Sequence, residues 1–279
     1  MPDLNASTAL CGIVLHPAGH TRSPAMHRAA YQALGLDAHY EVFDAPPSDL
    51  AGVLDHVRDQ GFRQIAVSIP HKEAVIGHLD RLDAVARKIG AVNTVTRIGD
   101  EWVGSNTDHV GAVRALKRLI EPAGKRAVVL GAGGAARAVV SGLIDAGTKV
   151  HVLNRTVDRA QHLAEALGAE GSGSLDDLGD LTHDILVNTT SVGLGDERSP
   201  VDPNHLTRGS VVMDAVYEPE VTRLLADAQA HGAHPLAGKW MLVYQAAAQL
   251  EIWSGRSAPI DVMAEAFDRA GGRSRRSPR

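Results

Sequence analysis

A strand, a glycine-rich turn and a helix in direct succession constrain the fold of this 279-residue chain more than any other feature. The apolar run "RAVVL" (126–130) leads into a G-x-G-x-x-A pattern made by Gly131, Gly133 and Ala136, and then into the helical pattern "ARAVVSGLIDAG". Glycines in such a turn let the backbone approach a pyrophosphate, and the helix start supplies N–H groups and a positive dipole end. We therefore expect a dinucleotide site, rather than a turn chosen only for tight packing, at Gly131, Ala132, Gly133, Gly134 and Ala135.

The end of the next strand, "KVHVLN", discriminates between two dinucleotides. NAD sites place an acidic residue there to hold the ribose hydroxyls, whereas this chain reads Asn154-Arg155-Thr156, with Arg159 one helical turn after Arg155. Guanidinium groups bind phosphate through paired hydrogen bonds, so these residues suit a 2′-phosphate. We expect NADP(H) as the cofactor. The alternative is a pair of exposed arginines on a surface helix.

The first hundred residues alternate strand and helix patterns, which is typical of a mostly parallel sheet covered by helices. Strand patterns at 11–15, 39–43 and 63–69 alternate with helical patterns at 23–35 and 48–61, and "AVNTVTRIGDEWVG" (91–104) predicts a hairpin. We therefore expect an α/β fold, with a second α/β unit that begins near Lys125.

The stretch "AVSIPHKEAV" (66–75) places a lysine where electrostatics disfavours it. A strand ends at Ile69, and the pattern predicts a helix beginning at Pro70, which suits the first helical position. Lys72 would then lie at the positive end of the helix dipole, at a cost of roughly 0.3–1 kcal/mol. From this stretch alone, the explanation is a long side chain that reaches solvent, so that the penalty stays small.

Composition narrows the classes of function. The formal net charge of −5 disfavours nucleic acid as a partner, and no apolar run is long enough to span a membrane. The single cysteine, Cys11, fits a reducing cytoplasm. We see no signal peptide, and we expect the basic tail "GGRSRRSPR" to be a disordered, solvated end.

From Cys11 to about Phe267 the chain resembles the shikimate dehydrogenases. The matching motifs, in family order, are "HTRSPAMH", "VSIPHKE", "GAVNTV", "NTDHVG", "GAGGAAR", "NRTVDRA", "VNTTSVG", "DAVYEP" and "GKWMLVYQAA". Several independent motifs in one order are far more specific than any single motif. The resemblance implies reversible reduction of 3-dehydroshikimate to shikimate with NADPH, a step toward chorismate and the aromatic amino acids, with the substrate as the main partner. It leaves a homodimer open. It also implies an α/β protein of two α/β domains with a cleft between them: an N-terminal substrate domain at 1–108, completed by about 240–279, and a Rossmann-type NADP-binding domain at 109–239.

The resemblance also implies a catalytic pair, Lys72 and Asp108. A carbonyl that receives a hydride becomes an alkoxide, to which an ammonium can give a proton while the aspartate holds the lysine. Thr21 and Ser23 match two serines that bind the substrate carboxylate. The other positions that match substrate contacts are Ser68, Asn93, Tyr217 and Gln245, and those that match nicotinamide-side contacts are Gly238 and Met241.

Each of these residues has a structural alternative. Ser23 and Asp108 could cap helices, Asn93 could lie in a turn, Gln245 could face solvent, and Met241 could be plain core.

Departures from the family pattern affect the identity of the substrate more than the class of reaction. Ala66-Val67-Ser68 replaces Asn-Val-Thr, Thr21 replaces serine, Arg223 stands where many members have proline, and "GKWMLV" replaces "GLGMLV", which puts Trp240 near the cofactor. The hydroxyls are kept but the pocket is reshaped. The alternatives are a related dehydrogenase for quinate, aminoshikimate or another hydroxy acid, and a catalytically idle NADP-binding regulator.

Overall fold

The computed structural model describes residues 5, 7–19 and 21–274, with side chains up to residue 271. Expectations for residues 1–4, 6, 20 and 275–279 lie outside the described residues. The tail was expected to be disordered from residue 271, but residues 271–274 complete the helix α9 (Ile260–Ser274). Across the described residues, no helix is long and apolar enough to cross a membrane.

Contacts within the chain divide it into two compact units, residues 1–107 with 246–279, and residues 108–245. We expected boundaries after Asp108 and near residue 240. Asp108 and residues 240–245 instead fall in the second unit. The later boundary lies inside one continuous helix, α8 (Lys239–Ser254), whose sequence carries no break at that point.

The first unit is built on a six-stranded sheet in the order β2-β1-β3-β5-β6-β4. β1 pairs in parallel with β2 and β3, whereas β3, β5 and β6 are successively antiparallel, so the predicted hairpin is confirmed. The strands are β1 (Ala9–Leu15), β2 (Ala38–Asp44), β3 (Gln64–Val67), β4 (Arg81–Leu82), β5 (Thr94–Ile98) and β6 (Glu101–Ser105).

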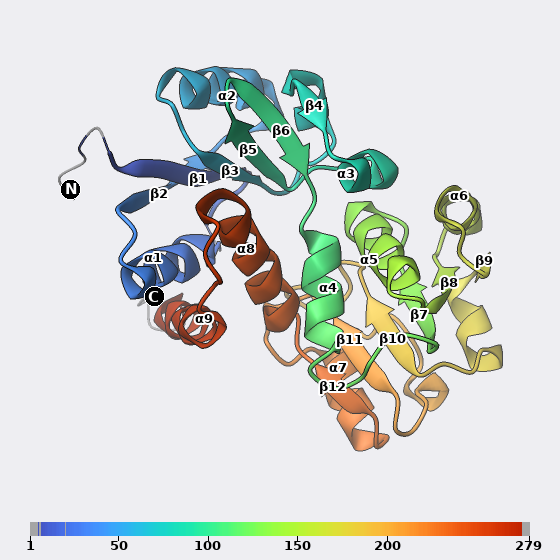
Figure 1. Ribbon diagram of the computed structural model, residues 1–279. Coiled ribbons are helices and arrows are strands. Elements are labelled where there is room, and N and C mark those ends of the chain that lie inside the picture. Colours follow the sequence, from blue (N-terminus) through green and yellow to red (C-terminus); the bar gives the residue numbers. More distant parts are fainter. Residues whose placement is uncertain (1–4, 6, 20, 275–279) are drawn as a thin grey trace. The chain divides into compact units, whose positions relative to one another are not determined.

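The helices of the first unit are α1 (Ser23–Leu34), α2 (Leu50–Asp59), α3 (Ala84–Ile89), α9 and the part of α8 from residue 246. α1 and α9 lie side by side (Figure 1). α1 ends at Gly35 as predicted, because the left-handed φ of 62° there lets the Gly35 N–H bond back to the Gln32 carbonyl.

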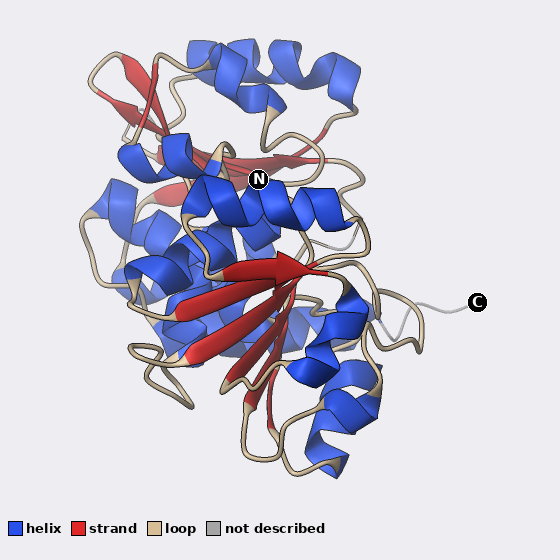
Figure 2. Cartoon of the chain, turned by 90° about the vertical axis from the view of Figure 1, so that its right-hand side faces the viewer, coloured by secondary structure: helices blue, strands red, loops and turns tan. Residues whose placement is uncertain are grey.

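The second unit carries a six-stranded sheet in the order β12-β11-β10-β7-β8-β9, with every pair parallel. Counted within the unit, this is the 3-2-1-4-5-6 order of a dinucleotide-binding fold, with the reversal between β7 and β10. Figure 2 shows its strands as a twisted fan between helices. The strands are β7 (Arg126–Leu130), β8 (Lys149–Leu153), β9 (Gly171–Gly173), β10 (Ile185–Asn188), β11 (Val211–Asp214) and β12 (His234–Leu236).

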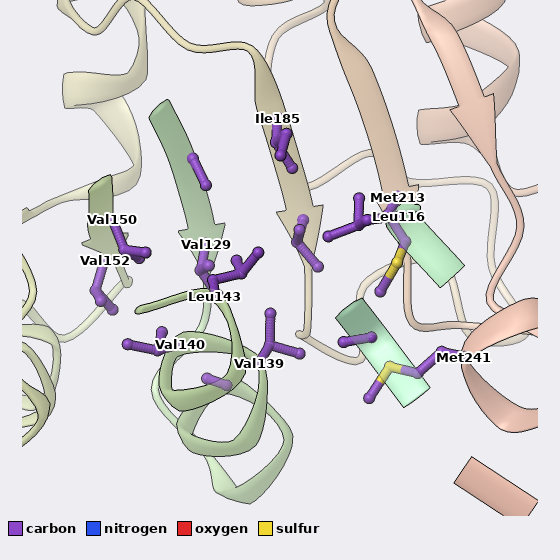
Figure 3. Close-up of a cluster of buried hydrophobic side chains, with 14 of the residues drawn as sticks. Leu116, Val129, Val139, Val140, Leu143, Val150, Val152, Ile185, Met213 and Met241 are labelled. Atoms are coloured by element: carbon purple, nitrogen blue, oxygen red, sulfur yellow. The ribbon is translucent and has the colours of Figure 1, made fainter. Parts of the chain in front are cut away.

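Apolar clusters cover both faces of the second sheet. The helices of this unit are α4 (Asp108–Leu116), α5 (Gly134–Asp145), α6 (Val157–Leu167), α7 (Arg223–Ala230) and the start of α8. Val129 and Val187 share one cluster with Leu143 of α5 (Figure 3), whereas Val128 and Leu186 share another with α7. Since neighbouring residues of a strand face opposite sides, strands buried on both faces read as continuous apolar runs.

Two glycines let α4 pack closely against its neighbours. A Cβ on Gly111 would lie 2.7 Å from the Met241 carbonyl oxygen of α8, and a Cβ on Gly142 of α5 would lie 2.9 Å from the His109 carbonyl oxygen. Any side chain at either position would push the helices apart. The position of α4, and of the aspartate that begins it, is therefore fixed by backbone contact.

Candidate active site

The candidates in the first unit lie at the edge of its sheet where β1 and β3 end and β5 begins. Ser68 directly follows β3 and Asn93 directly precedes β5, while Thr21 and Ser23 lie between β1 and the start of α1. The Val67 N–H donates to the Asn93 carbonyl at 2.8 Å, which joins two of these segments. Four of the predicted residues therefore come from segments that converge on one edge.

Lys72 does not lie in the first turn of an α-helix, so our prediction for the segment after Pro70 was wrong. The Ile69–Pro70 peptide is cis, and turns follow until the short 3₁₀ helix η2 (Ala74–His78). The Lys72 carbonyl accepts a hydrogen bond from the Val92 N–H at 2.8 Å, and the Ile69 carbonyl is likewise taken by another segment. Because these carbonyls bond to residues distant in sequence, they do not form helical hydrogen bonds. Lys72 therefore does not lie at the positive end of an α-helix dipole.

Asn93 organises a buried hydrogen-bond network beside Lys72. It is 2% exposed, and its Oδ1 accepts from the Thr107 N–H at 2.7 Å and from the Thr94 hydroxyl at 2.8 Å, while Nδ2 donates to the Thr107 hydroxyl at 3.1 Å. Gln249 of α8 donates to the Asn93 carbonyl at 3.2 Å and to the Thr94 hydroxyl at 3.1 Å. The Asn93 side chain thus joins several segments, which goes beyond a local role in a turn.

Asp108 is the first residue of α4 and is 6% exposed. A carboxylate is favoured at a helix N-terminus, so the structural and the catalytic readings of this residue both fit its position. Thr107, directly before it, is held by Asn93, and Gly111, one turn after it, packs against α8. The residues before and after Asp108 are therefore both held in place, which fixes its backbone.

Ser23 does not cap α1, which removes its structural alternative. The N-cap position belongs to Arg22, and no side chain there bonds to the helix. The Arg22 guanidinium lies 4.2 Å from the centroid of the Phe267 ring, which fixes the start of the helix. Ser23 is 5% exposed, and its N–H lies 3.4 Å from the hydroxyl of the half-buried Thr21.

The glycine turn of the second unit has the predicted local structure. β7 ends at Leu130, Gly131 adopts a φ of 112°, and α5 begins at Gly134 with Gly133 as its N-cap. A Cβ on Gly131 would lie 2.6 Å from the Thr189 hydroxyl, so only glycine fits there. A Cβ on Gly133 or Gly134 would meet no atom within 4 Å, so these two residues face open space at a helix N-terminus. The predicted positions of Ala132 and Ala135 flank them.

The predicted 2′-phosphate residues lie at the end of β8 and the start of α6. Asn154 holds the bend by donating to the Thr156 carbonyl at 2.9 Å, and Thr156 is the N-cap of α6. Arg155 and Arg159 are exposed, and neither has a carboxylate partner among the described residues. The open glycine turn and two uncompensated guanidiniums fit a dinucleotide with an additional phosphate.

The remaining candidates of the second unit lie around the ends of β11 and β12. Gly238 packs so closely that a Cβ would lie 2.6–2.8 Å from three carbonyl oxygens of residues 214–216. Asp214 fixes the same segment, because its carboxylate accepts from the Asn188 amide at 2.9 Å and the Thr222 hydroxyl at 2.7 Å. Burial raises the pKa of Asp214 above its ordinary value. The half-buried Tyr217 lies three residues further along the chain.

Gln245 and Met241 are both 8% exposed on the first turns of α8. Gln245 does not face solvent, so that alternative was wrong. Its amide donates to the Leu242 carbonyl at 3.1 Å. Met241 belongs to the buried cluster in Figure 3, as its structural alternative proposed. The Arg118 guanidinium packs on the Trp240 ring, 3.4 Å from the ring centroid. Trp240, which departs from the family pattern, therefore has a packing partner in this chain.

Sequence reasoning missed the residues that hold the candidates in place. Gln249, Thr107 and the Asn188–Asp214 pair were not singled out. A second glutamine in the apolar run "MLVYQAAAQLEIW" was a usable signal, since a buried amide in an apolar helix needs a partner. The carbonyl contacts of Gly238 had no signal beyond the glycine itself.

Comparisons with known proteins cover both units. Three family models match: shikimate dehydrogenase substrate binding domain at residues 13–95, shikimate/quinate 5-dehydrogenase at 114–194, and shikimate 5′-dehydrogenase C-terminal domain at 238–266. A protein of Natronomonas pharaonis named shikimate dehydrogenase (NADP+) is 45% identical over 259 residues, which are 92% of this chain and 97% of that protein.

Solved structures agree with this relationship. The shikimate 5-dehydrogenase of Thermus thermophilus, in complex with NADP(H) and shikimate, is 40% identical with a TM-score of 0.89, over 94% of this chain and all of that one. A ligand-free 5-ketofructose reductase of Gluconobacter is 37% identical with a TM-score of 0.87, over 95% of this chain and 99% of that one. The fold, the order of motifs and the extent of identity agree: this chain belongs to the shikimate dehydrogenase family.

Proposed function

We propose that this chain is an NADP-dependent shikimate dehydrogenase, which reduces 3-dehydroshikimate reversibly to shikimate. The observation that carries the proposal is the Asn93 network. Asn93 binds the N–H of Thr107, the residue directly before Asp108, and the neighbouring Val92 donates its N–H to the Lys72 carbonyl. A lysine and an aspartate on segments that bond to two adjacent residues suit a shared proton-transfer role.

The protein's own groups handle the proton and the orientation of the substrate. NADPH supplies the hydride when it is bound. The alkoxide oxygen that forms on the substrate takes a proton from the Lys72 ammonium, and the Asp108 carboxylate holds that ammonium in place. In the reverse direction, neutral Lys72 accepts the proton of the hydroxyl group that is being oxidised.

Hydroxyl and amide groups hold the rest of the substrate. Thr21 and Ser23 donate hydrogen bonds to its carboxylate, and the ring hydroxyls are met by Ser68, Asn93, Tyr217 and Gln245. Gly238 and Met241 border the nicotinamide. Residues 131–135 would hold the pyrophosphate of the dinucleotide, and Asn154, Arg155, Thr156 and Arg159 would hold its 2′-phosphate.

A related polyhydroxy substrate is the second candidate. Ala66 and Ser68 are smaller than the asparagine and threonine that the family pattern has there, and Ala66 is 7% exposed in β3, so the change lies beside the edge that carries the site. The similarity to a 5-ketofructose reductase is nearly as great as to the Thermus shikimate dehydrogenase. These two observations favour testing more than one alcohol.

A substrate panel tests the proposal. Initial rates of NADP+ and NAD+ reduction are measured with shikimate, quinate and fructose, with Lys72→Ala as the background control. We expect shikimate with NADP+ to give the highest kcat/KM. A higher kcat/KM for quinate or fructose would assign the second candidate, and no oxidation of any of them above background would overturn the enzyme assignment.

Two further features belong to the proposal. The free, buried Cys11 fits a reducing compartment, so we place the enzyme in the cytoplasm. We also keep the homodimer as a prediction, which light scattering at two concentrations would test.

A further inference from the structure

The first unit has a pocket where β1 and β3 begin and β5 ends, at the opposite ends of the strands from Ser68, Lys72 and Asn93. Its volume is about 360 Å³, and its chemical character comes from Arg63, Thr96, Arg97, Ile98, Ile252 and Trp253. Arg63 precedes β3, Ile98 ends the antiparallel β5, and Ile252 and Trp253 lie in the last turn of α8. Every lining residue belongs to the first unit.

The pocket carries positive charge that is little compensated. No acidic residue lines it, and Arg63 has no carboxylate partner among the described residues. Arg97 donates through Nε to the Gly99 carbonyl at 3.1 Å, and its terminal nitrogen lies 3.5 Å from Asp100, whose side chain is fully exposed. An exposed ion pair of this kind is weak, and a guanidinium has five N–H groups, so Arg97 keeps donors for a further anion.

The other side of the pocket is apolar. Ile98 and Ile252 are 51% and 46% exposed, which is high for isoleucine, and the half-buried Trp253 ring packs edge-on against Tyr31 at 5.7 Å between centroids. Small-molecule sites typically combine mostly apolar walls with a few polar groups, and their volumes begin near 300 Å³. The volume here suits a single ring with a short substituent, and it is too small for a dinucleotide.

The pocket lies directly behind the Asn93 network without being part of it. Thr96 lines the pocket, and Thr94, two residues earlier on the same face of β5, shares Gln249 with Asn93. Trp253 is one helical turn after Gln249 on α8. The two sites are therefore backed by the same strand and the same helix, but they open at opposite ends of the strands.

We propose that this pocket binds a small carboxylate that carries a flat apolar ring. The carboxylate bonds to the guanidiniums of Arg63 and Arg97, and the ring lies among Ile98, Ile252 and Trp253. Such a ligand differs from the polyhydroxy acid of the proposed reaction, whose hydroxyls would lose their hydrogen bonds against isoleucine.

Direct binding tests the proposal with 3-phenylpropanoate as the probe, measured by titration calorimetry and tryptophan fluorescence on the full chain. We expect saturable binding with a Kd on the order of 0.1–1 mM, as a ligand of this size allows. The fluorescence change should be absent in Trp253→Phe. The neutral 3-phenylpropanamide should bind at least about tenfold more weakly, because it lacks the charge-assisted hydrogen bonds.

Variants separate this pocket from the reaction site. Arg63→Met should weaken binding of the probe about tenfold or more, and Ile252→Glu should abolish it by repulsion, whereas the control Arg269→Met, an exposed arginine of α9 outside the pocket, should change nothing. Saturating shikimate should not displace the probe. The proposal is overturned by an absence of saturable binding up to about 10 mM, by full binding in Arg63→Met, or by displacement with shikimate.

Discussion

The close approach of α4 to α8 makes Gly111→Ala a sharp test of how Asp108 is held. The new Cβ would lie 2.7 Å from the Met241 carbonyl oxygen, 2.9 Å from Gln245 Cβ and 3.0 Å from the Gln245 nitrogen. Two of these are backbone atoms of a helix, which cannot rotate away. Overpacking of this kind costs about 1–3 kcal/mol, and alanine in a helix returns about 0.5–1 kcal/mol. We expect a net loss of about 1–2 kcal/mol.

The assay is thermal unfolding together with kcat for the same preparations. A loss of about 1–2 kcal/mol in the free energy of unfolding corresponds to a fall in Tm of about 3–8 °C for a domain the size of the second unit. Because Asp108 lies one turn before Gly111, a displaced α4 should also lower kcat by more than the lost stability alone would at 25 °C. The matched control is Gly52→Ala in α2, where a Cβ meets nothing within 4 Å, and it should raise stability slightly. A Gly111→Ala variant as stable as Gly52→Ala would refute the reasoning.

Three further changes test other parts of the account. Burial lowers the pKa of His27 to about 4, so below pH 6.5 the unfolded chain binds more protons than the folded chain, and the free energy of unfolding should fall by about 2 kcal/mol from pH 7 to pH 5. His27→Phe should remove that part of the dependence of Tm on pH, and an unchanged dependence would contradict this role of His27. Arg155→Ala should lower kcat/KM for NADP+ about tenfold or more and change NAD+ less than about threefold, and equal losses would argue against a 2′-phosphate contact. Ser23→Ala should raise the KM for shikimate about tenfold with little change in Tm, because the hydroxyl caps no helix, and the reverse pattern would restore a structural role.

The local sequence pattern was sufficient to predict the glycine turn of the second unit and the strand and helix on either side of it. Strands buried on both faces read as apolar runs, and the glycine turn has few conformations, so β7, Gly131 and α5 could be predicted from the residues. The interpretation of Arg155 as a phosphate ligand was also local, since it needs only the end of β8 and the start of α6, and it stays a prediction.

Tertiary hydrogen bonds explain what local pattern could not predict. The segment after Pro70 has a helical sequence, yet the Lys72 carbonyl bonds to Val92, twenty residues away, and the helix is replaced by turns. The Asn93 network joins Thr107, 14 residues away, and Gln249, 156 residues away. Ser23 was a good cap by composition, but the helix takes Arg22 as its N-cap, and the Arg22 guanidinium packs on Phe267. In each case a partner distant in the chain decided the outcome.

The most direct test of the central claim is the set of kcat values for Lys72→Ala, Asp108→Ala and the double variant with shikimate and NADP+. Each single change should lower kcat by roughly 10²–10⁴, the range for general acid–base catalysis. The double variant should be little worse than the poorer single variant, because residues that act as one unit are non-additive. NADPH binding, followed by fluorescence, should be unchanged in all three. A Lys72→Ala variant with near-wild-type kcat would contradict the account, and two losses that simply multiply would mean two separate roles.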